Sequence, residues 1–251
     1  METETQLKEH ERIEDLQFKG LRIIQNKNKF CFGTDAVLLS HFAGIRRGDR
    51  VVDLGTGTGI IPILLAGRMD EASLVGVEIQ SDMAEMANRS IQMNDLEPRV
   101  KILEADLKDA PEKLGKGSFS LVVSNPPYKK TGSGILNPED DMAIARHEVL
   151  CTLEDVLFSA SKLLQVGGRF AMVHRPERMM DILMGMRSVQ LEPKRIRMVH
   201  SQLHKAPSLI LIEAISHGKP FLSWMPPLIM YDENNKYTDE LKEIYHLTPI
   251  T

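Results

Sequence analysis

Residues 50–66 read RVVDLGTGTGIIPILLA and decide the fold. The apolar, β-branched residues 50–54 predict a buried strand, residues 55–59 a glycine turn, and residues 60–66 a helix. Such a turn lets the backbone approach a ligand closely and presents the first N–H groups of the helix to it. The dinucleotide fingerprint expects its last glycine where Ile60 stands, so a nicotinamide cofactor is disfavoured. The stretch therefore predicts a ligand site built on a strand, a turn and a helix.

Three further predicted strands each lead into a polar side chain. The run LVGVE ends in Glu78, RVKILEAD ends in Asp106, and FSLVVS runs into Asn125. In a doubly wound sheet the ligand lies outside the carboxyl ends of the parallel strands, so one cleft would collect these side chains together with Asp53. Glu78 in that place can accept hydrogen bonds from both hydroxyls of a ribose. Its structural alternative is an interaction with the N-terminus of the following helix.

The order of these elements predicts an α/β fold with a doubly wound, Rossmann-like sheet. We expect the sheet to be mostly parallel with helices on both faces, and residues 196–200 and 209–215 to form an antiparallel C-terminal strand pair. A chain of 251 residues fits one such domain. We expect residues 1–15 to be a disordered acidic lead, and residues 16–251 to be a single domain that opens with a short hairpin and helix extension over residues 16–45.

Composition limits the class of protein. The hydrophobic content of 42% suffices for a full core, and no apolar run approaches the ~20 residues of a membrane span. The polar N-terminus has no signal-peptide core, and Cys31 and Cys151 match no metal or redox spacing. We therefore expect a reduced, cytoplasmic protein with no membrane contact and no required metal. The sequence leaves the oligomeric state open.

The net charge of −4 argues weakly against a nucleic-acid partner. However, residues 1–15 hold six acids and two bases, so the rest of the chain is neutral and carries local basic clusters. Such clusters can hold phosphates, although each is more often an ordinary solvated surface.

The strand FSLVVS leads into Asn125-Pro126-Pro127-Tyr128, a sequence that predicts a chemistry. The two prolines fix φ and remove two N–H donors, so the chain leaves the strand as a stiff corner that cannot wind into a helix. The Asn125 side-chain oxygen and the Pro126 carbonyl could then accept both hydrogens of a planar NH2 group and aim its lone pair at an electrophile. Tyr128 offers a flat face on which a planar group can stack. The alternative is a plain turn with a surface tyrosine.

Other residues are candidates for ligand contacts. Lys129 and Lys130 directly follow the corner and could meet phosphates, while Arg146 is equally compatible with a phosphate contact and with an ion pair to a nearby acid. Thr34 and Asp35 precede an apolar helical stretch, where either could cap the helix or face a ligand at its N-terminus. These alternatives stay open.

In this order and spacing, DLGTGTG, the Glu78 strand end, EAD and NPPY resemble the class I S-adenosylmethionine-dependent methyltransferases, whose amino-methylating branch carries Asn-Pro-Pro-Tyr. Phe32-Gly33-Thr34-Asp35, Ala145-Arg146-His147-Glu148 and the hairpin and tail of residues 228–245 are similar to the bacterial tRNA(Val) adenosine-N6-methyltransferases. The resemblance spans nearly the whole chain. It implies that residues 16–251 form a methyltransferase domain.

The resemblance also implies a cofactor, a substrate and site residues. The cofactor would be S-adenosyl-L-methionine, and the acceptor would be the exocyclic N6 amine of an adenosine in RNA, in that subfamily the tRNA anticodon-loop adenosine 3′ of the anticodon. The implied cofactor-binding residues are Thr34, Asp53, Gly55, Thr56, Gly57, Glu78, Asp106 and Asn125. The implied catalytic residues are Asn125, Pro126, Pro127 and Tyr128. The implied substrate-binding residues are Tyr128, Lys129, Lys130 and Arg146.

Three other functions stay open. N5-glutamine methylation of a protein is one, because release-factor methyltransferases share Asn-Pro-Pro-Tyr; those enzymes carry a helical N-terminal domain, and residues 1–49 are too few for it. A non-catalytic protein that binds RNA or the cofactor is the second, and it would have no need of the Asn125 geometry. A nicotinamide oxidoreductase is the third.

Overall fold

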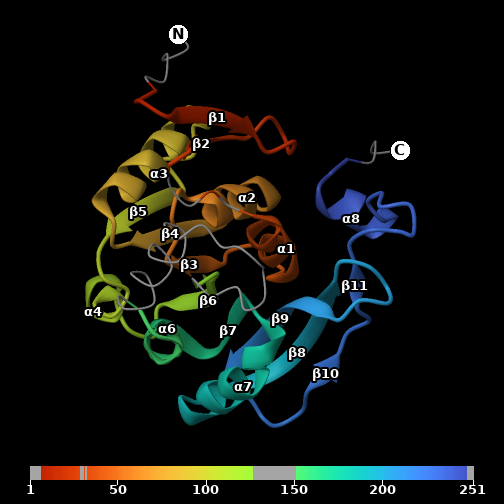
Figure 1. The fold of residues 1–251 in the computed structure, drawn as a ribbon. Coiled ribbons are helices and arrows are strands. Elements are labelled where there is room, and N and C mark those ends of the chain that lie inside the picture. Colours follow the sequence, from red (N-terminus) through yellow and green to blue (C-terminus); the bar gives the residue numbers. More distant parts are fainter. Residues whose placement is uncertain (1–6, 29–30, 32, 127–150, 248–251) are drawn as a thin grey trace.

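The computed structural model describes residues 7–28, 31, 33–126 and 151–247, and the structural account concerns these residues. They form a large sheet with helices on both faces and a separate two-stranded hairpin (Figure 1). In chain order the elements are β1 (Glu11–Asp15), β2 (Arg22–Asn26), α1 (Thr34–Phe42), β3 (Arg50–Leu54), α2 (Ile60–Arg68), β4 (Ser73–Glu78), α3 (Ser81–Met93), β5 (Val100–Glu104), α4 (Ala110–Leu114), β6 (Phe119–Ser124), α6 (Leu153–Leu163), β7 (Leu164–His174), the 3-10 turn η1 (Pro176–Arg178), α7 (Met179–Ser188), β8 (Leu191–His200), β9 (Pro207–Ser216), β10 (Ser223–Trp224), β11 (Leu228–Ile229) and α8 (Asp239–Ile244).

The strand order of the large sheet is β10-β8-β9-β7-β6-β3-β4-β5, and β11 also pairs with β8. The strands from β7 to β5 in this order are parallel, whereas β9 runs antiparallel to both β7 and β8. The predicted doubly wound, mostly parallel sheet with an antiparallel C-terminal pair is therefore confirmed. The chain goes from β3 to β4 on one side and places β6 on the other, so the switch point of the sheet lies between β3 and β6.

The register of the central strands brings their carboxyl ends to one edge. Leu54, the last residue of β3, pairs with Val77 of β4 and with Ser124 of β6. Glu78, the last residue of β4, pairs with Glu104, the last of β5. Segments that follow β3, β4, β5 and β6 therefore start side by side, as the sequence predicts.

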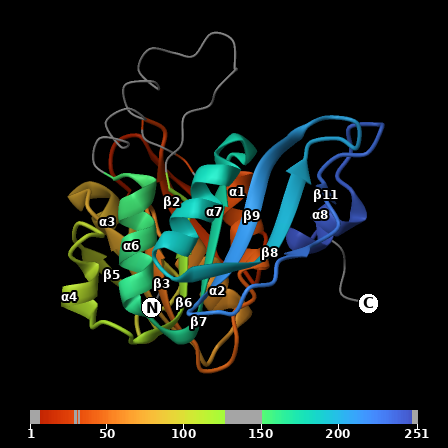
Figure 2. The same ribbon diagram turned by 90° about the horizontal axis from the view of Figure 1, so that it is seen from below.

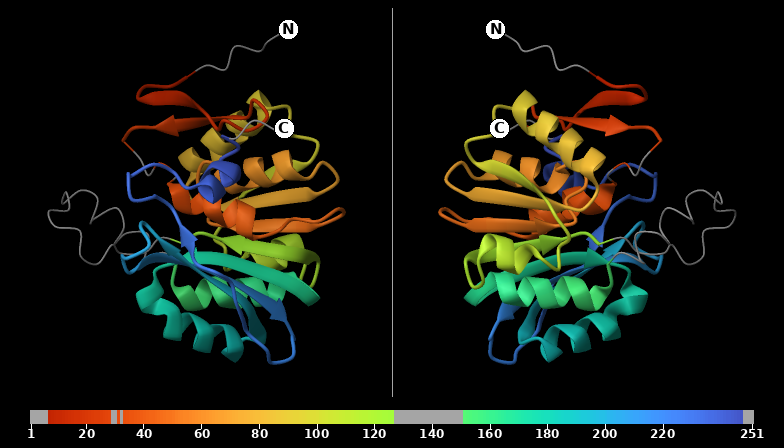
Figure 3. Two further views of the ribbon diagram at one scale, coloured as in Figure 1. Left: turned by 90° about the vertical axis from the view of Figure 1, so that its right-hand side faces the viewer. Right: turned by 90° about the vertical axis from the view of Figure 1, so that its left-hand side faces the viewer.

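Two apolar clusters hold the helices against the sheet, one on each face (Figures 2 and 3). The first contains Leu38 of α1, Leu64 of α2 and Ile91 of α3. The second contains Leu157 of α6 and Ile182 of α7. All five side chains are at most 2% exposed, so each contributes about 1.5–3 kcal/mol of burial free energy. None of the described helices is long and apolar enough to cross a membrane.

The N-terminal hairpin begins earlier than the sequence predicts. Strand β1 pairs antiparallel with β2, so the prediction of a disordered lead is wrong for residues 11–15, which belong to this hairpin. The hairpin is fixed to α3, because the Ile24 N–H donates to the Ser90 hydroxyl at 3.0 Å and the Arg22 N–H to the Asn94 side-chain oxygen at 2.8 Å. These bonds hold β2 in place, and β1, whose polar composition does not predict a strand, pairs with β2.

Arg89 of α3 clamps the first strand of the hairpin. Its guanidinium donates two hydrogen bonds to the Glu11 carboxylate, at 2.6 and 2.8 Å, and two to the Glu85 carboxylate, at 2.8 and 3.0 Å. The Glu11 side chain is 2% exposed, and its hydrogen bond to Arg89 lowers its pKa. A buried bidentate pair of this kind is among the stronger charge-assisted contacts.

We expect Arg89→Ala to lower the free energy of unfolding by about 2 kcal/mol, because the buried Glu11 carboxylate loses its two guanidinium donors and keeps the Lys8 N–H at 2.7 Å. Urea unfolding of Arg89→Ala, Glu11→Ala and the double variant would show coupling between the two side chains. Arg12→Ala, which removes an exposed arginine of the same strand, is the matched control and should change stability by less than about 0.5 kcal/mol. Additive effects of the Arg89 and Glu11 variants would contradict the clamp.

Two regions of the C-terminal half differ from what local patterns predict. Residues 153–164 have helical periodicity and Gly167-Gly168 reads as a stop, yet β7 already begins at Leu164 and carries these glycines in an irregular stretch opposite β6. Helix α7 has only two buried residues, Ile182 and Met186, and its methionine-rich sequence gives a weak periodic pattern. Packing against the sheet, not the local sequence pattern, determines where β7 begins and where α7 lies.

Candidate functional site

The glycine turn follows β3 at the switch edge of the sheet. Gly55, Gly57 and Gly59 have φ values of 76°, 57° and 84°, a left-handed backbone that favours glycine. The N–H groups of Gly55 and Thr56 both donate to the Val77 carbonyl of β4, at 2.9 and 3.0 Å. A Cβ added at Gly55 would stand in open space, with no atom within 4 Å. The turn is thus tied to the sheet while Gly55 leaves room beside the backbone.

Gly76 of β4 makes space for the side chain of Thr56. A Cβ at this position would lie 2.7 Å from both Thr56 Cγ2 and Oγ1, and 2.9 Å from Ile102 Cδ1. The glycine is therefore required by the turn that packs above it.

We expect Gly76→Ala to lower the free energy of unfolding by about 1–3 kcal/mol, because the added methyl group must push the Thr56 side chain and the turn away. Chemical denaturation measures this loss. Ser73→Ala, at an exposed position of the same strand, is the control and should unfold like the wild type. Wild-type stability of Gly76→Ala would contradict the close approach.

Asp53 and Thr56 form a buried pair of polar side chains next to each other at the glycine turn. Asp53 is 1% exposed, and neither its two carboxylate oxygens nor the Thr56 hydroxyl has a hydrogen-bond partner among the described residues. Burial raises the pKa of Asp53 to about 7; the nearby Thr56 hydroxyl opposes the rise and the Glu78 charge adds to it. Buried acceptors without donors are rare in folded proteins. This pair fits a ligand that supplies N–H donors or a positive charge.

Gln25 of β2 is a residue of this region that the sequence analysis did not select. Its side chain is fully buried, and its Nε2 donates to the Thr58 hydroxyl at 3.2 Å. Its Oε1 has no hydrogen-bond partner in the described part of the chain. The hairpin therefore reaches the glycine turn. A glutamine in a polar strand gives no local signal of this contact, which arises only when β2 packs on α3.

Glu78 is held by the turn and by the start of α3. It is 5% exposed, and its carboxylate accepts hydrogen bonds from the Gly57 N–H and the Gln80 N–H, both at 2.9 Å. Gln80 is the N-cap residue of α3, so Glu78 does interact with the N-terminus of the following helix, which is the structural alternative to a ribose contact. Its predicted contact to a ribose stays a prediction, and the carboxylate is fixed where such a contact would be made.

Asp106 follows β5 at the same edge and is partly buried. Its carboxylate accepts from the Lys108 N–H at 2.9 Å and pairs with the Lys108 ammonium at 3.2 Å. A side chain already oriented by two local donors keeps lone pairs for a further amine.

Asn125 and Pro126 leave β6 directly beside the glycine turn. Ser124, the residue before them, donates its hydroxyl hydrogen to the Leu54 carbonyl at 2.9 Å, so the ends of β6 and β3 are bonded to each other. Asn125 is half-buried and Pro126 is buried. The predicted site residues Pro127, Tyr128, Lys129, Lys130 and Arg146 lie outside the described residues.

Thr34 is the first residue of α1, which also points toward this edge. Gly33 occupies the N-cap position and makes no side-chain cap, whereas the Asp35 carboxylate accepts a hydrogen bond from the Ala36 N–H of the first turn at 3.0 Å, so Asp35 stabilises the start of the helix. Tyr245, just after α8, lies against Thr34: burial raises the pKa of its phenol, and the Thr34 hydroxyl opposes that rise. The C-terminal tail thus reaches the start of α1, a long-range contact that no local pattern predicts.

The structure therefore brings together Asp53, Thr56, Glu78 and Asn125 around one edge of the sheet, as predicted. Within residues 7–28, 31, 33–126 and 151–247, no group of three or more His, Cys, Asp or Glu side chains is placed to hold a metal ion.

Comparisons with known proteins show which family the chain resembles. Residues 15–191 match the family model described as the methyltransferase small domain. A Porphyromonas gingivalis protein named tRNA1(Val) (adenine(37)-N6)-methyltransferase is 34% identical over 202 residues, which cover 78% of this chain and 78% of that protein. A Parabacteroides distasonis protein of the same name is 32% identical over 231 residues, 91% of this chain and 94% of that protein.

Among solved structures, an Agrobacterium tumefaciens protein described as a predicted O-methyltransferase is similar with a TM-score of 0.70 and 25% identity, covering 84% of this chain and 95% of that one. The fold, the glycine turn at the switch edge and the match over most of the sequence agree. The chain belongs to the methyltransferase small domain family.

Proposed function

We propose that the protein transfers a methyl group from S-adenosyl-L-methionine to the exocyclic N6 amine of an adenosine in tRNA, at the anticodon-loop position 3′ of the anticodon. The observation that carries this proposal is the bond between Ser124 and Leu54, which places the Asn125-Pro126 corner next to the glycine turn. The names of the relatives, tRNA1(Val) (adenine(37)-N6)-methyltransferase, support the substrate.

The residues of the turn fit the cofactor. The Asp53 carboxylate and the Thr56 hydroxyl, whose oxygens have no hydrogen-bond partner among the described residues, would hold its positively charged amino-acid end, with Thr34 on the facing helix. Gly55 and Gly57 leave the backbone open beneath it. The ends of the next two strands would contact the rest of the cofactor: Glu78 would hold the ribose, and Asp106 would hold the adenine amino group.

When bound, S-adenosylmethionine supplies a methyl group on a positively charged sulfur, so the protein mainly needs to align an amine with it. The Asn125 Oδ1 and the Pro126 carbonyl would accept the two N–H hydrogens of adenine N6 and aim its lone pair at the methyl carbon. These acceptors bind more strongly as the nitrogen gains positive charge, which favours the transition state over the ground state. The proton leaves afterwards to water.

The residues outside the described part of the chain complete the proposal. Pro127 would stiffen the corner, Tyr128 would stack on the target base, and Lys129, Lys130 and Arg146 would meet RNA phosphates. An adenosine in a loop is a suitable target, because unstacking it costs least.

The test is incubation of the protein with labelled S-adenosylmethionine and, in separate reactions, total tRNA, total rRNA and release factors, followed by mass spectrometry of the labelled nucleosides. N6-methyladenosine in tRNA is the expected product. Label on a release-factor glutamine would instead support the N5-glutamine alternative, and no transfer with cofactor retained would support a binding protein. Action on tRNA would place the enzyme in the cytoplasm.

A further inference from the structure

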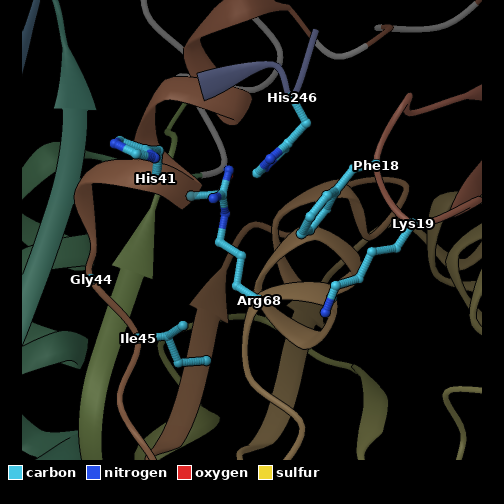
Figure 4. Close-up of a pocket in the computed structure, with 9 residues that line it drawn as sticks. Phe18, Lys19, His41, Gly44, Ile45, Arg68 and His246 are labelled. Atoms are coloured by element: carbon cyan, nitrogen blue, oxygen red, sulfur yellow. The ribbon is translucent and has the colours of Figure 1, made fainter. Parts of the chain in front are cut away.

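A pocket lies at the far ends of α1 and α2 from the glycine turn (Figure 4). It has a volume of about 370 Å³ and combines Phe18 and Lys19 of the hairpin turn, His41 of α1, Arg68 of α2 and His246 of the C-terminal tail. Figure 4 shows the Arg68 side chain between His41 and Phe18, below His246. Segments from both ends of the chain therefore meet here.

The ionisable side chains that line the pocket, as far as the chain is described, are all basic ones. Lys19 and Arg68 carry full charges, and His41 and His246 can carry further ones. Among the described residues neither Lys19 nor Arg68 has an acidic side chain within ion-pair distance. Asp15 lines an adjoining pocket together with Arg68 and His246 but forms no ion pair with Arg68. Positive charges gathered without an ion-pair partner repel one another, and a bound anion would relieve that repulsion.

Arg68 has donors to spare. Its only hydrogen bond in the described part of the chain is a long one, from Nη2 to the Ile244 carbonyl at 3.5 Å, and its Nε is buried without a partner. The guanidinium lies 5.3 Å from the centroid of the Phe18 ring, which in turn stacks on His246 at 4.0 Å with an angle of 11°. The aromatic pair fixes the orientation of a fork that suits a phosphate.

The surroundings lower the pKa of both histidines. The pKa of His41 is lowered first by burial and then by the charges of Arg68 and Arg197, and His246 adds to the lowering. Glu240 raises this pKa, but its carboxylate is already paired with Arg197 at 2.6 Å.

For His246 the lowering of the pKa has the same first cause, burial, followed by the charges of Arg68 and Lys19. A bound anion would offset these positive charges and raise the pKa of both histidines, so their titration can be used to detect anion binding.

An RNA that occupied the methylation site would have to extend along α1 and α2 to reach the pocket. Helices α1 and α2 both start at the site edge, and each has 9 residues. At ~1.5 Å per residue they extend about 13 Å, a distance that about four stacked nucleotides at ~3.4 Å each would cover.

We propose that this pocket binds a phosphate group, and that in the working enzyme this is a backbone phosphate of the RNA substrate, contacted by Arg68 and Lys19. The second half of this inference rests on the proposed function; the first half does not. The competing role for these cations is to stabilise the carbonyl ends of α1 and α2, where His41 and Arg68 stand in the last turns. That role would need no anion and would give no response to one.

The first experiment uses inorganic phosphate as the probe. The Cε1 protons of His41 and His246 are followed by NMR through a pH titration, with and without phosphate, in sodium chloride of equal ionic strength. We expect phosphate to raise both apparent pKa values by about 1, and Arg68→Gln to remove the response. Identical titration curves with and without phosphate would overturn the site.

The second experiment measures tRNA binding against salt for the wild type, Arg68→Gln, Lys19→Gln and Lys113→Gln. Lys113 is exposed on α4, which packs on the other face of the sheet, so it controls for net charge. Loss of one phosphate contact should lower the salt slope by about 0.7–0.9 and weaken binding about fivefold at 0.15 M salt. Lys19 is exposed, so its variant keeps the test valid if Arg68→Gln is poorly folded.

The outcomes separate the two claims. Reduced slopes for the Arg68 and Lys19 variants, with a normal slope for Lys113→Gln, support the RNA phosphate. A phosphate response in the histidines with wild-type slopes in all variants identifies a site for free phosphate and overturns the RNA assignment. A wild type that methylates tRNA while neither response appears overturns the pocket and leaves the proposed function standing; a wild type that methylates no RNA overturns the function.

Discussion

Replacement of Asn125 by alanine should lower the rate of methyl transfer about a hundredfold, while the affinity for S-adenosylmethionine stays near that of the wild type. The side-chain oxygen of Asn125 is one of the two acceptors that would orient the amine, and it acts most strongly as the nitrogen becomes positive. Asn125 follows the last residue of β6 and is half-buried. Single-turnover kinetics with saturating cofactor measure the rate, and calorimetry measures the affinity.

Asn88→Ala is the matched control for this experiment. Asn88 is an exposed asparagine of α3 whose side chain donates to the Ala84 carbonyl of its own helix, at 3.0 Å. Its removal should leave both rate and affinity unchanged. If Asn125→Ala lost cofactor affinity as much as it lost rate, Asn125 would be a cofactor ligand and not the residue that orients the amine.

Asp53→Asn should have the second large effect, with opposite signs on stability and on cofactor binding. The pKa of Asp53 is about 7 in the folded protein, against an ordinary value of 3.8, so the folded state binds more protons than the unfolded state between these values. The cofactor-free protein should therefore lose stability as pH rises from about 4 to about 7. Above that range, the ionised buried carboxylate costs on the order of 4 kcal/mol.

Asparagine removes this titration and keeps the shape of the side chain. At pH 8 the cofactor-free variant should unfold at a higher temperature than the wild type, and near pH 4 the two should be alike. The same variant should bind S-adenosylmethionine at least tenfold more weakly, because the acceptor for its positive end has lost its charge. Thermal unfolding at several pH values and calorimetry test both statements; a pH-independent difference in stability would contradict the buried carboxylate.

The elements nearest the site could be predicted from sequence because local chemistry decides them. β3 and β6 were expected at the bounds they have, since each is a continuous apolar run ended by a glycine turn or by prolines. Parallel strands then bring their ends to one edge by topology, so Asp53, Glu78 and Asn125 could be grouped without coordinates.

Features that depend on long-range contacts could not be predicted. β1 is a polar strand whose order comes from Arg89, a residue 78 positions away in the sequence. Gln25 reaches the glycine turn only because the hairpin packs on α3, and Tyr245 reaches Thr34 only because the tail folds back over α1. The basic pocket needs all three of these distant segments, the hairpin turn, the ends of α1 and α2, and the tail, to be in place.

A crystal structure with S-adenosylhomocysteine and adenosine would test most directly whether the end of β6 presents an amine to the methyl donor. Adenosine N6 should lie about 3 Å from both the Asn125 Oδ1 and the Pro126 carbonyl oxygen, on the side that faces the cofactor sulfur across the glycine turn. An adenine ring bound with N6 turned away from these two acceptors, or a cofactor sulfur on the far side of the turn, would contradict the account.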